Sequence, residues 1–134
     1  MGDIALAVPA DGAANGYSGV QAKLAALQRA AAQLMEHADR VAQSMRANAK
    51  AAVVVAELSA AAQVDGGHVA AIGEVAGHFG RVAGGARRLS GAADAMHQAA
   101  GHVRSEHQAE YSGVHAAVTA SRARQAKPGF YRQP

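Results

Sequence analysis

The stretch Val64-Asp65-Gly66-Gly67-His68 lies between two long segments in which small and apolar residues recur at alternating steps of three and four. This spacing is the heptad pattern of helices that pack along a seam. The pattern covers residues 24–62 before the stretch and residues 72–117 after it. We therefore predict a long antiparallel hairpin of two helices with its turn at residues 64–68.

The residues of this turn favour a chain reversal. Gly66 and Gly67 accept positive backbone angles, and Asp65 is placed to cap the helix that follows. Residues that face each other in an antiparallel pair have numbers with a constant sum, and a fold about Gly67 predicts a sum of 134. In this register large residues face small ones, as Met96 faces Ala38, which fills a narrow seam without voids.

The composition predicts a thin core. The chain has 134 residues, enough for one domain, and half of them are hydrophobic, but many of these are alanine and only 4% are aromatic. Alanine buries little apolar area, so we expect a partner to share in the stabilisation. We predict an all-α, alanine-rich coiled coil that pairs into a four-helix assembly. We expect residues 1–18 to form a flexible lead, residues 19–124 the hairpin and residues 125–134 a flexible tail.

Several functional classes have no support in the sequence. The chain has no cysteine and a net charge of +3, and it has no apolar run long enough to span a membrane. It also lacks a phosphate loop, a nucleophile elbow and paired carboxylates in a predicted pocket. We expect a soluble, cytoplasmic protein that is neither an enzyme nor a cofactor carrier, with secretion as the alternative location. Nucleic-acid binding is compatible with the mild basicity but is not favoured.

One asparagine and a group of glycines are candidates for setting the register and the assembly. Asn48 falls at a seam position opposite Ala86, where a buried Asn would fix register or oligomeric state; the alternative is that it points into solvent. The second segment is rich in glycine, which is costly inside a helix. We interpret four of these glycines as a second packing face, on which hairpins pair into a four-helix assembly, the alternative being a locally weak, mobile helix. They are Gly73, Gly77, Gly80 and Gly84.

Five cations lie at similar levels on the two segments once the hairpin is folded. They are Arg46, Lys50, Arg81, Arg87 and Arg88. This basic belt is a candidate anion contact, although we favour an ordinary solvated helix face.

Histidines and carboxylates gather at the open end of the predicted hairpin. His102, Glu106, His107 and Glu110 occur at helical spacings at which imidazole and carboxylate groups could hold a divalent ion. We favour a hydrated helix end over a metal site.

The C-terminal tail is a candidate docking peptide for a protein partner. It carries Lys127, Pro128, Gly129, Phe130 and Tyr131, in which an aromatic pair is flanked by cations. A solvated tail without a partner is the alternative.

A long hairpin of this size resembles the WXG100 class of type VII secretion substrates. The Trp-x-Gly turn of that class is missing, and no Tyr-x-x-x-Asp/Glu export signal follows the second segment. The start Met1-Gly2-Asp3-Ile4-Ala5-Leu6 and the ending Lys127-Pro128-Gly129-Phe130-Tyr131 resemble small helical conjugal-transfer proteins of actinobacterial mobile elements. The residues lead us to expect a structural or adaptor hairpin that self-associates and presents its tail to a partner, and the resemblance of the chain ends would place it in plasmid transfer. The alternative is a secreted WXG100-like protein.

Overall fold

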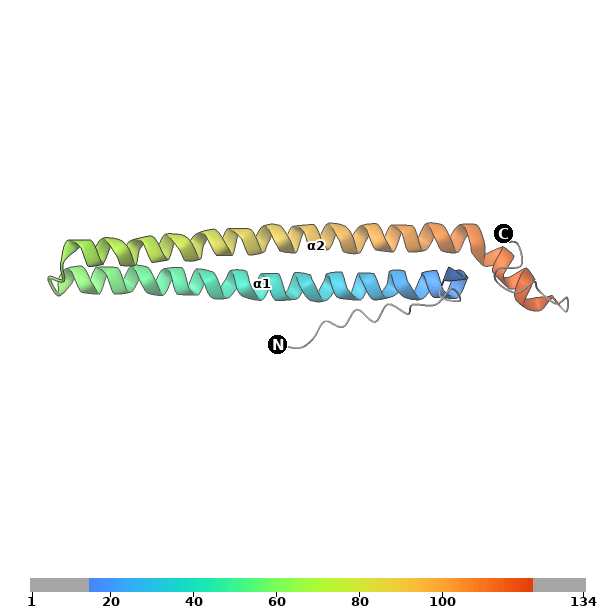
Figure 1. Ribbon diagram of the computed structural model, residues 1–134, viewed down its shortest axis with the longest axis horizontal. Helices are drawn as coiled ribbons and strands as arrows, with labels where there is room; N and C mark the ends of the chain where they lie inside the picture. The colour runs from blue at the N-terminus through green and yellow to red at the C-terminus, as the bar shows by residue number, and fades with distance from the viewer. Residues whose placement is uncertain (1–14, 122–134) are drawn as a thin grey trace, which may run out of the picture. The chain divides into compact units, whose positions relative to one another are not determined.

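The computed structural model describes residues 15–121, which form two long α-helices. Helix α1 spans Tyr17–Ala61 and helix α2 spans Gly66–Ala120, and no strand occurs within the described range. The prediction of an all-α helical hairpin is confirmed (Figure 1). Residues 1–14 and 122–134, which hold most of the predicted lead and the whole docking tail, lie outside the described residues.

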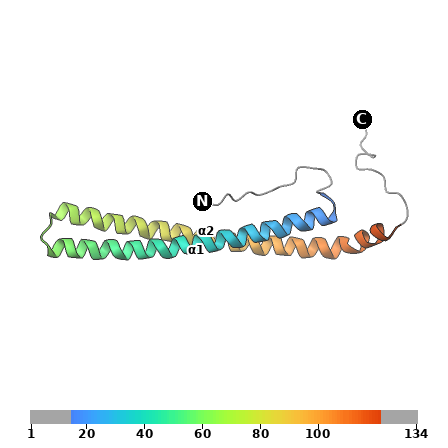
Figure 2. The same ribbon diagram turned by 90° about the horizontal axis from the view of Figure 1, so that it is seen from below.

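The hairpin consists of two compact units that we describe separately. One unit comprises residues 30–97 and contains the turn. In it the C-terminal part of α1 and the N-terminal part of α2 lie side by side and antiparallel (Figures 1 and 2). The described part of the other unit comprises residues 15–29 of α1 and residues 98–121 of α2.

Helix α1 ends in a Schellman motif, which satisfies carbonyl groups that the last turn leaves without helical partners. The amide of Val64 donates to the carbonyl of Ser59 at 3.0 Å, and the amide of Gln63 donates to the carbonyl of Ala60 at 3.0 Å. Gln63 has a φ of 59° and is the left-handed residue of this motif. The prediction that glycines supply the left-handed backbone of the turn is therefore wrong.

Helix α2 begins at the two glycines and is capped by Asp65. The Oδ2 atom of Asp65 accepts a hydrogen bond from the backbone amide of Gly67 at 3.0 Å and lies 3.3 Å from Nδ1 of His68. The predicted capping role of Asp65 is confirmed. Because Gly66 and Gly67 form the first turn of α2, the connection occupies residues 62–65, earlier than the predicted residues 64–68.

The seam between the helices of the turn-containing unit has a different register from the predicted one. Ala42 and Ala86 are 3% and 9% exposed, and Ala38 and Ser90 are 4% and 9% exposed. The predicted sum of 134 is wrong, because it pairs the buried Ala38 with Met96, which is 49% exposed. A sum of 128 instead matches buried residues with buried ones, Ala42 with Ala86 and Ala38 with Ser90. The earlier turn explains the shift, since the last residue of α1 and the first residue of α2 have numbers that add to 127.

Half of the predicted seam positions lie outside the seam. Among the described residues, those that are buried are alanines apart from Ser90, and alanines let two helices approach more closely than large side chains allow. Each helix is therefore turned so that alanine, serine and a few larger residues face inward. Val41, Leu89 and Met96, which were predicted to lie inside, are 44%, 47% and 49% exposed.

The inward side of the other unit is partly polar. Gln21 Nε2 donates to the carbonyl of Arg104 at 3.1 Å and lies 2.9 Å from Nδ1 of His107. Arg104 in turn donates through Nε to Oε1 of Gln21 at 3.2 Å. Gln28 crosses so close to α2 that a Cβ atom at Gly101 would lie 2.6 Å from its Nε2 atom. Side-chain hydrogen bonds thus join α1 and α2 in this unit.

Candidate interaction surfaces

Large apolar residues excluded from the narrow seam form a stripe along one side of residues 30–97. On each helix they recur every seven residues, and each immediately precedes a buried or half-buried seam residue. Positions of this kind on two antiparallel helices border the same side of the seam. We call this stripe the apolar flank, and it consists of Leu34, Val41, Asn48 and Val55 on α1 and Val75, Val82, Leu89 and Met96 on α2.

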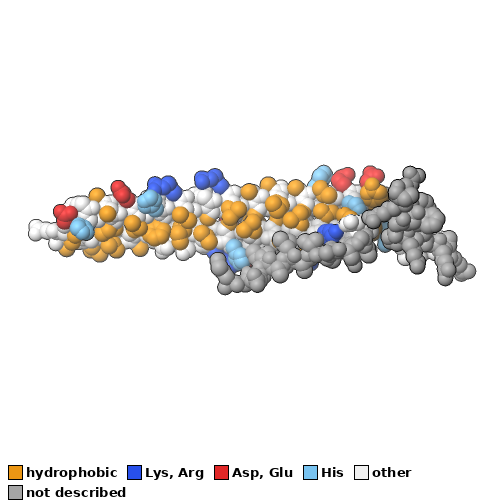
Figure 3. All heavy atoms as spheres, in the orientation of Figure 1, with side chains coloured by type: hydrophobic (Ala, Val, Ile, Leu, Met, Phe, Trp, Pro, Cys, Tyr) orange, Lys and Arg blue, Asp and Glu red, His pale blue; other side chains and the backbone are white. Residues whose placement is uncertain are grey.

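The apolar flank is unusually exposed for a hydrophobic surface. Six of its side chains are between 44% and 51% exposed, and its eight positions include no charged residue. Figure 3 shows hydrophobic side chains gathered along both helices in the half that contains the turn. Contiguous apolar surface of this kind is typical of a site where another protein packs.

Asn48 is exposed and belongs to the apolar flank. The predicted place in the seam opposite Ala86 is wrong, because the rotation of α1 brings Ala49 inward, and the predicted alternative, a solvent-exposed Asn48, is what the structure has. Asn48 is the one polar side chain among the eight positions of the flank, and at that place it is open to solvent or to a partner.

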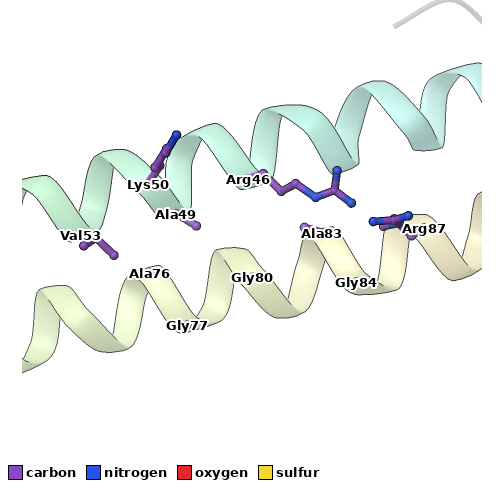
Figure 4. A pocket seen from close by; sticks show the side chains of 10 residues that line it. All are labelled: Arg46, Ala49, Lys50, Val53, Ala76, Gly77, Gly80, Ala83, Gly84 and Arg87. Atoms are coloured by element: carbon purple, nitrogen blue, oxygen red, sulfur yellow. The ribbon is translucent and has the colours of Figure 1, made fainter.

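The opposite side of the same unit is hollowed into an open groove of about 850 Å³ (Figure 4). Small residues form its floor, and three cations lie at its edges. We call it the basic groove, and it is lined by Arg46, Ala49, Lys50 and Val53 of α1 and by Ala76, Gly77, Gly80, Ala83, Gly84 and Arg87 of α2. The predicted basic belt is therefore divided, since Arg81 and Arg88 do not line the groove.

The cations of the basic groove differ in direction. The side chains of Arg46 and Arg87 extend toward each other between α1 and α2, whereas that of Lys50 points away from α2 (Figure 4). No hydrogen bond or ion pair joins any of these three side chains to another residue within 15–121. Arg81 instead donates to Nδ1 of its neighbour His78. Two guanidinium groups thus converge on the groove without a carboxylate between them.

The packing of the hairpin does not require the four predicted assembly glycines. A Cβ atom at Gly73 or Gly80 would meet no atom within 4 Å. At Gly77 and Gly84 it would lie 3.8 Å from an arginine side chain, which is ordinary contact. Since glycine costs about 1 kcal/mol relative to alanine inside a helix, the hairpin alone would be more stable with alanine there. Three of these glycines, all except Gly73, line the basic groove.

Aromatic rings gather in the unit that contains the start of α1. Tyr17 stacks on His107 with ring centroids 5.3 Å apart and on His115 with centroids 4.6 Å apart. Tyr111 lies tilted against His107 at 5.1 Å. These rings line a pocket of about 450 Å³ together with Asn15, Val114 and Val118. Tyr17 was not among the predicted site residues, because its place beside these rings depends on the pairing of α1 with α2.

The predicted metal candidates are not brought together. His102, Glu106 and Glu110 are exposed, while His107 is engaged by Tyr17 and Gln21. Within residues 15–121 no group of three or more His, Cys, Asp or Glu side chains has a geometry that could hold a metal ion.

Comparisons with protein-family models, with curated proteins and with solved structures found no match for this chain. Neither helix, over its described length, is both long and apolar enough to cross a membrane.

Proposed function

We propose that this protein is a non-enzymatic structural or adaptor protein that self-associates through the apolar flank. The observation that carries the proposal is the row of six half-exposed Val, Leu and Met side chains on one side of a seam built mainly from alanine. A hairpin with so thin a core buries little apolar area by itself. Pairing of two hairpins into a four-helix assembly would add the missing burial.

The energy available from the apolar flank is of the size needed for association. Burying one Val, Leu or Met side chain fully contributes about 1.5–3 kcal/mol, so each half-exposed side chain retains roughly 1 kcal/mol. Two copies that cover each other's six side chains would gain roughly 12 kcal/mol. Association costs about 4–15 kcal/mol. Gain and cost are of the same order, so we expect self-association that depends on protein concentration.

A second copy suits the apolar flank because the flank is uncharged and contains residues of both helices. A twofold axis across it pairs the surface with itself, which is the commonest arrangement in homo-oligomers. Asn48 would then lie inside the new interface, where an Asn that finds a partner amide fixes the register of packed helices. In this arrangement Asn48 would fix the register between two hairpins, whereas the sequence predicted that it fixes the register within one.

The proposal is tested by placing charge on the apolar flank. Val82→Lys with Leu89→Lys should keep the hairpin helical, because both side chains are half exposed, but should reduce the mass measured by light scattering to that of a monomer. Leu58→Lys is the matched control, because Leu58 is 65% exposed and lies outside the flank. The proposal fails if the double variant and the control have the same mass as the wild type.

The predicted docking tail and the place of the protein in the cell are further parts of this proposal. The resemblance of the two chain ends would assign the assembly to plasmid transfer, and that of the hairpin to type VII secretion. A conjugation role is favoured if the gene lies among transfer genes, and a WXG100-like role if it lies among secretion genes. Residues 127–131 would then carry the contact with the partner protein.

A further inference from the structure

We infer that the basic groove binds an acidic α-helix of another protein. The groove lies on the side of the seam opposite the apolar flank, so self-association leaves it open. The inference therefore goes beyond the proposed self-association and does not depend on it.

The charge of the groove selects an acidic ligand. Arg46 and Arg87 extend into it from different helices and have no ion pair or hydrogen bond with another residue in the described range. Lys50 adds a third cation at the edge, and no Asp or Glu lines the groove. Guanidinium groups pair with carboxylates through two parallel hydrogen bonds, so one Glu or Asp could engage either arginine.

The floor of the groove selects a ligand that is apolar as well as acidic. Apart from the three cations, the lining residues are Ala, Gly and Val. They offer no side-chain hydroxyl or amide, and the backbone amides of α1 and α2 are used within the helices. A small phosphate would therefore find few donors here besides the arginines. A ligand that has methyl groups and carboxylates on the same face would contact both the apolar floor and the cations at the edges.

The shape of the groove selects a helix over an extended peptide. An extended peptide has unpaired backbone groups, which would be left without partners against an Ala and Gly floor. A helix satisfies its own backbone hydrogen bonds. Glycines at positions 77, 80 and 84 let a second backbone approach closely. Lining residues 76–87 of α2 span roughly 18 Å, the length of about three turns of a docked helix.

The test uses a helical peptide as the probe. We would use an alanine-rich peptide of about 20 residues with Glu at every fourth position, together with an analogue that carries Gln in place of Glu. Binding to the full chain is measured by calorimetry and repeated at higher salt. We expect the Glu peptide to bind, with an affinity that falls as salt rises, and the Gln peptide to bind much more weakly.

Matched variants locate the binding in the groove. Arg46→Gln with Arg87→Gln should weaken binding about tenfold or more, whereas Arg81→Gln with Arg88→Gln removes the same charge from residues that do not line the groove and should change little. Gly80→Leu should also abolish binding, because it fills the floor at a position where a Cβ atom meets nothing within 4 Å. Helix content is recorded for each variant to show that the hairpin is intact.

Other outcomes would overturn the inference. It fails if the Glu peptide does not bind at about 1 mM, or if both pairs of Arg→Gln variants weaken binding equally. Binding of pyrophosphate or duplex DNA without binding of the Glu peptide would make the groove a phosphate contact. A change in the self-associated mass of the Arg46→Gln, Arg87→Gln variant would make the groove part of the interface between copies. Loss of self-association in the apolar-flank variant with peptide binding retained would affect only the proposed function.

Discussion

A disulfide between positions 42 and 86 would test the register of the hairpin. Ala42 and Ala86 are both buried in the seam of residues 30–97, so the pair Ala42→Cys with Ala86→Cys should oxidise readily within one chain. The bond would close a loop of about 45 residues, for which the chain-entropy model gives about 4 kcal/mol of stabilisation. At a urea dependence near 2 kcal/mol/M, this stabilisation raises the unfolding midpoint by roughly 2 M.

The assay compares urea unfolding of the oxidised and reduced forms by circular dichroism at low protein concentration. The matched pair is Ala38→Cys with Met96→Cys, which face each other only in the register with a sum of 134. Ala38 is buried and Met96 is 49% exposed, so this pair should not form a bond within one chain. Rapid oxidation of the Ala38 and Met96 pair, with none at positions 42 and 86, would refute the register described here.

Three further predictions concern single elements of the hairpin. Gln63→Gly should stabilise the protein by about 1 kcal/mol in urea unfolding, because it relieves a left-handed non-glycine residue; a loss of stability would contradict the Schellman cap. Asp65→Ala should cost about 1 kcal/mol in the same assay, because it removes the acceptor of the Gly67 amide, and an unchanged midpoint would show that the cap contributes nothing. Deleting residues 127–134 removes no part of α1 or α2, so thermal melting should be unchanged; partial unfolding would show instead that the tail packs on the hairpin.

The periodicity of the sequence was sufficient to predict the helices but not their rotation. Apolar residues at alternating steps of three and four define a stripe along each helix. The predicted stripe and the stripe that forms the seam have every second residue in common, so the pattern fits both. The large residues Val82 and Leu89 made one stripe look like the seam, whereas the closer approach allowed by Ala83 and Ser90 favours the other. The sequence pattern does not show whether close packing of alanines stabilises the pair more than packing of larger side chains at a greater distance between the helices.

The turn shows a similar limit. Asp65 was predicted to cap α2 because it directly precedes the helix, where an Asp side chain can accept hydrogen bonds from the first backbone amides, and this is confirmed. The glycines that follow it were assigned to the reversal because glycine accepts a left-handed backbone at no cost. The chain uses Gln63 for that conformation and leaves both glycines inside α2.

The candidate surfaces were predicted in part. Arg46, Lys50 and Arg87 were identified by charge and helical level, and three of the four assembly glycines lie beside them. Arg87 lines the groove, whereas Arg81 and Arg88 do not. This difference depends on which side of α2 faces α1, and therefore on the rotation of the helix. The apolar flank escaped prediction for the same reason, since its residues had been assigned to the seam.

Sedimentation equilibrium of the full wild-type chain over a wide range of concentrations tests the central claim most directly. The monomer has a mass of 13.5 kDa. If the apolar flank joins two hairpins, the weight-average mass should rise with concentration toward twice that value. A mass of 13.5 kDa at every concentration would contradict self-association and leave the apolar flank without its proposed partner.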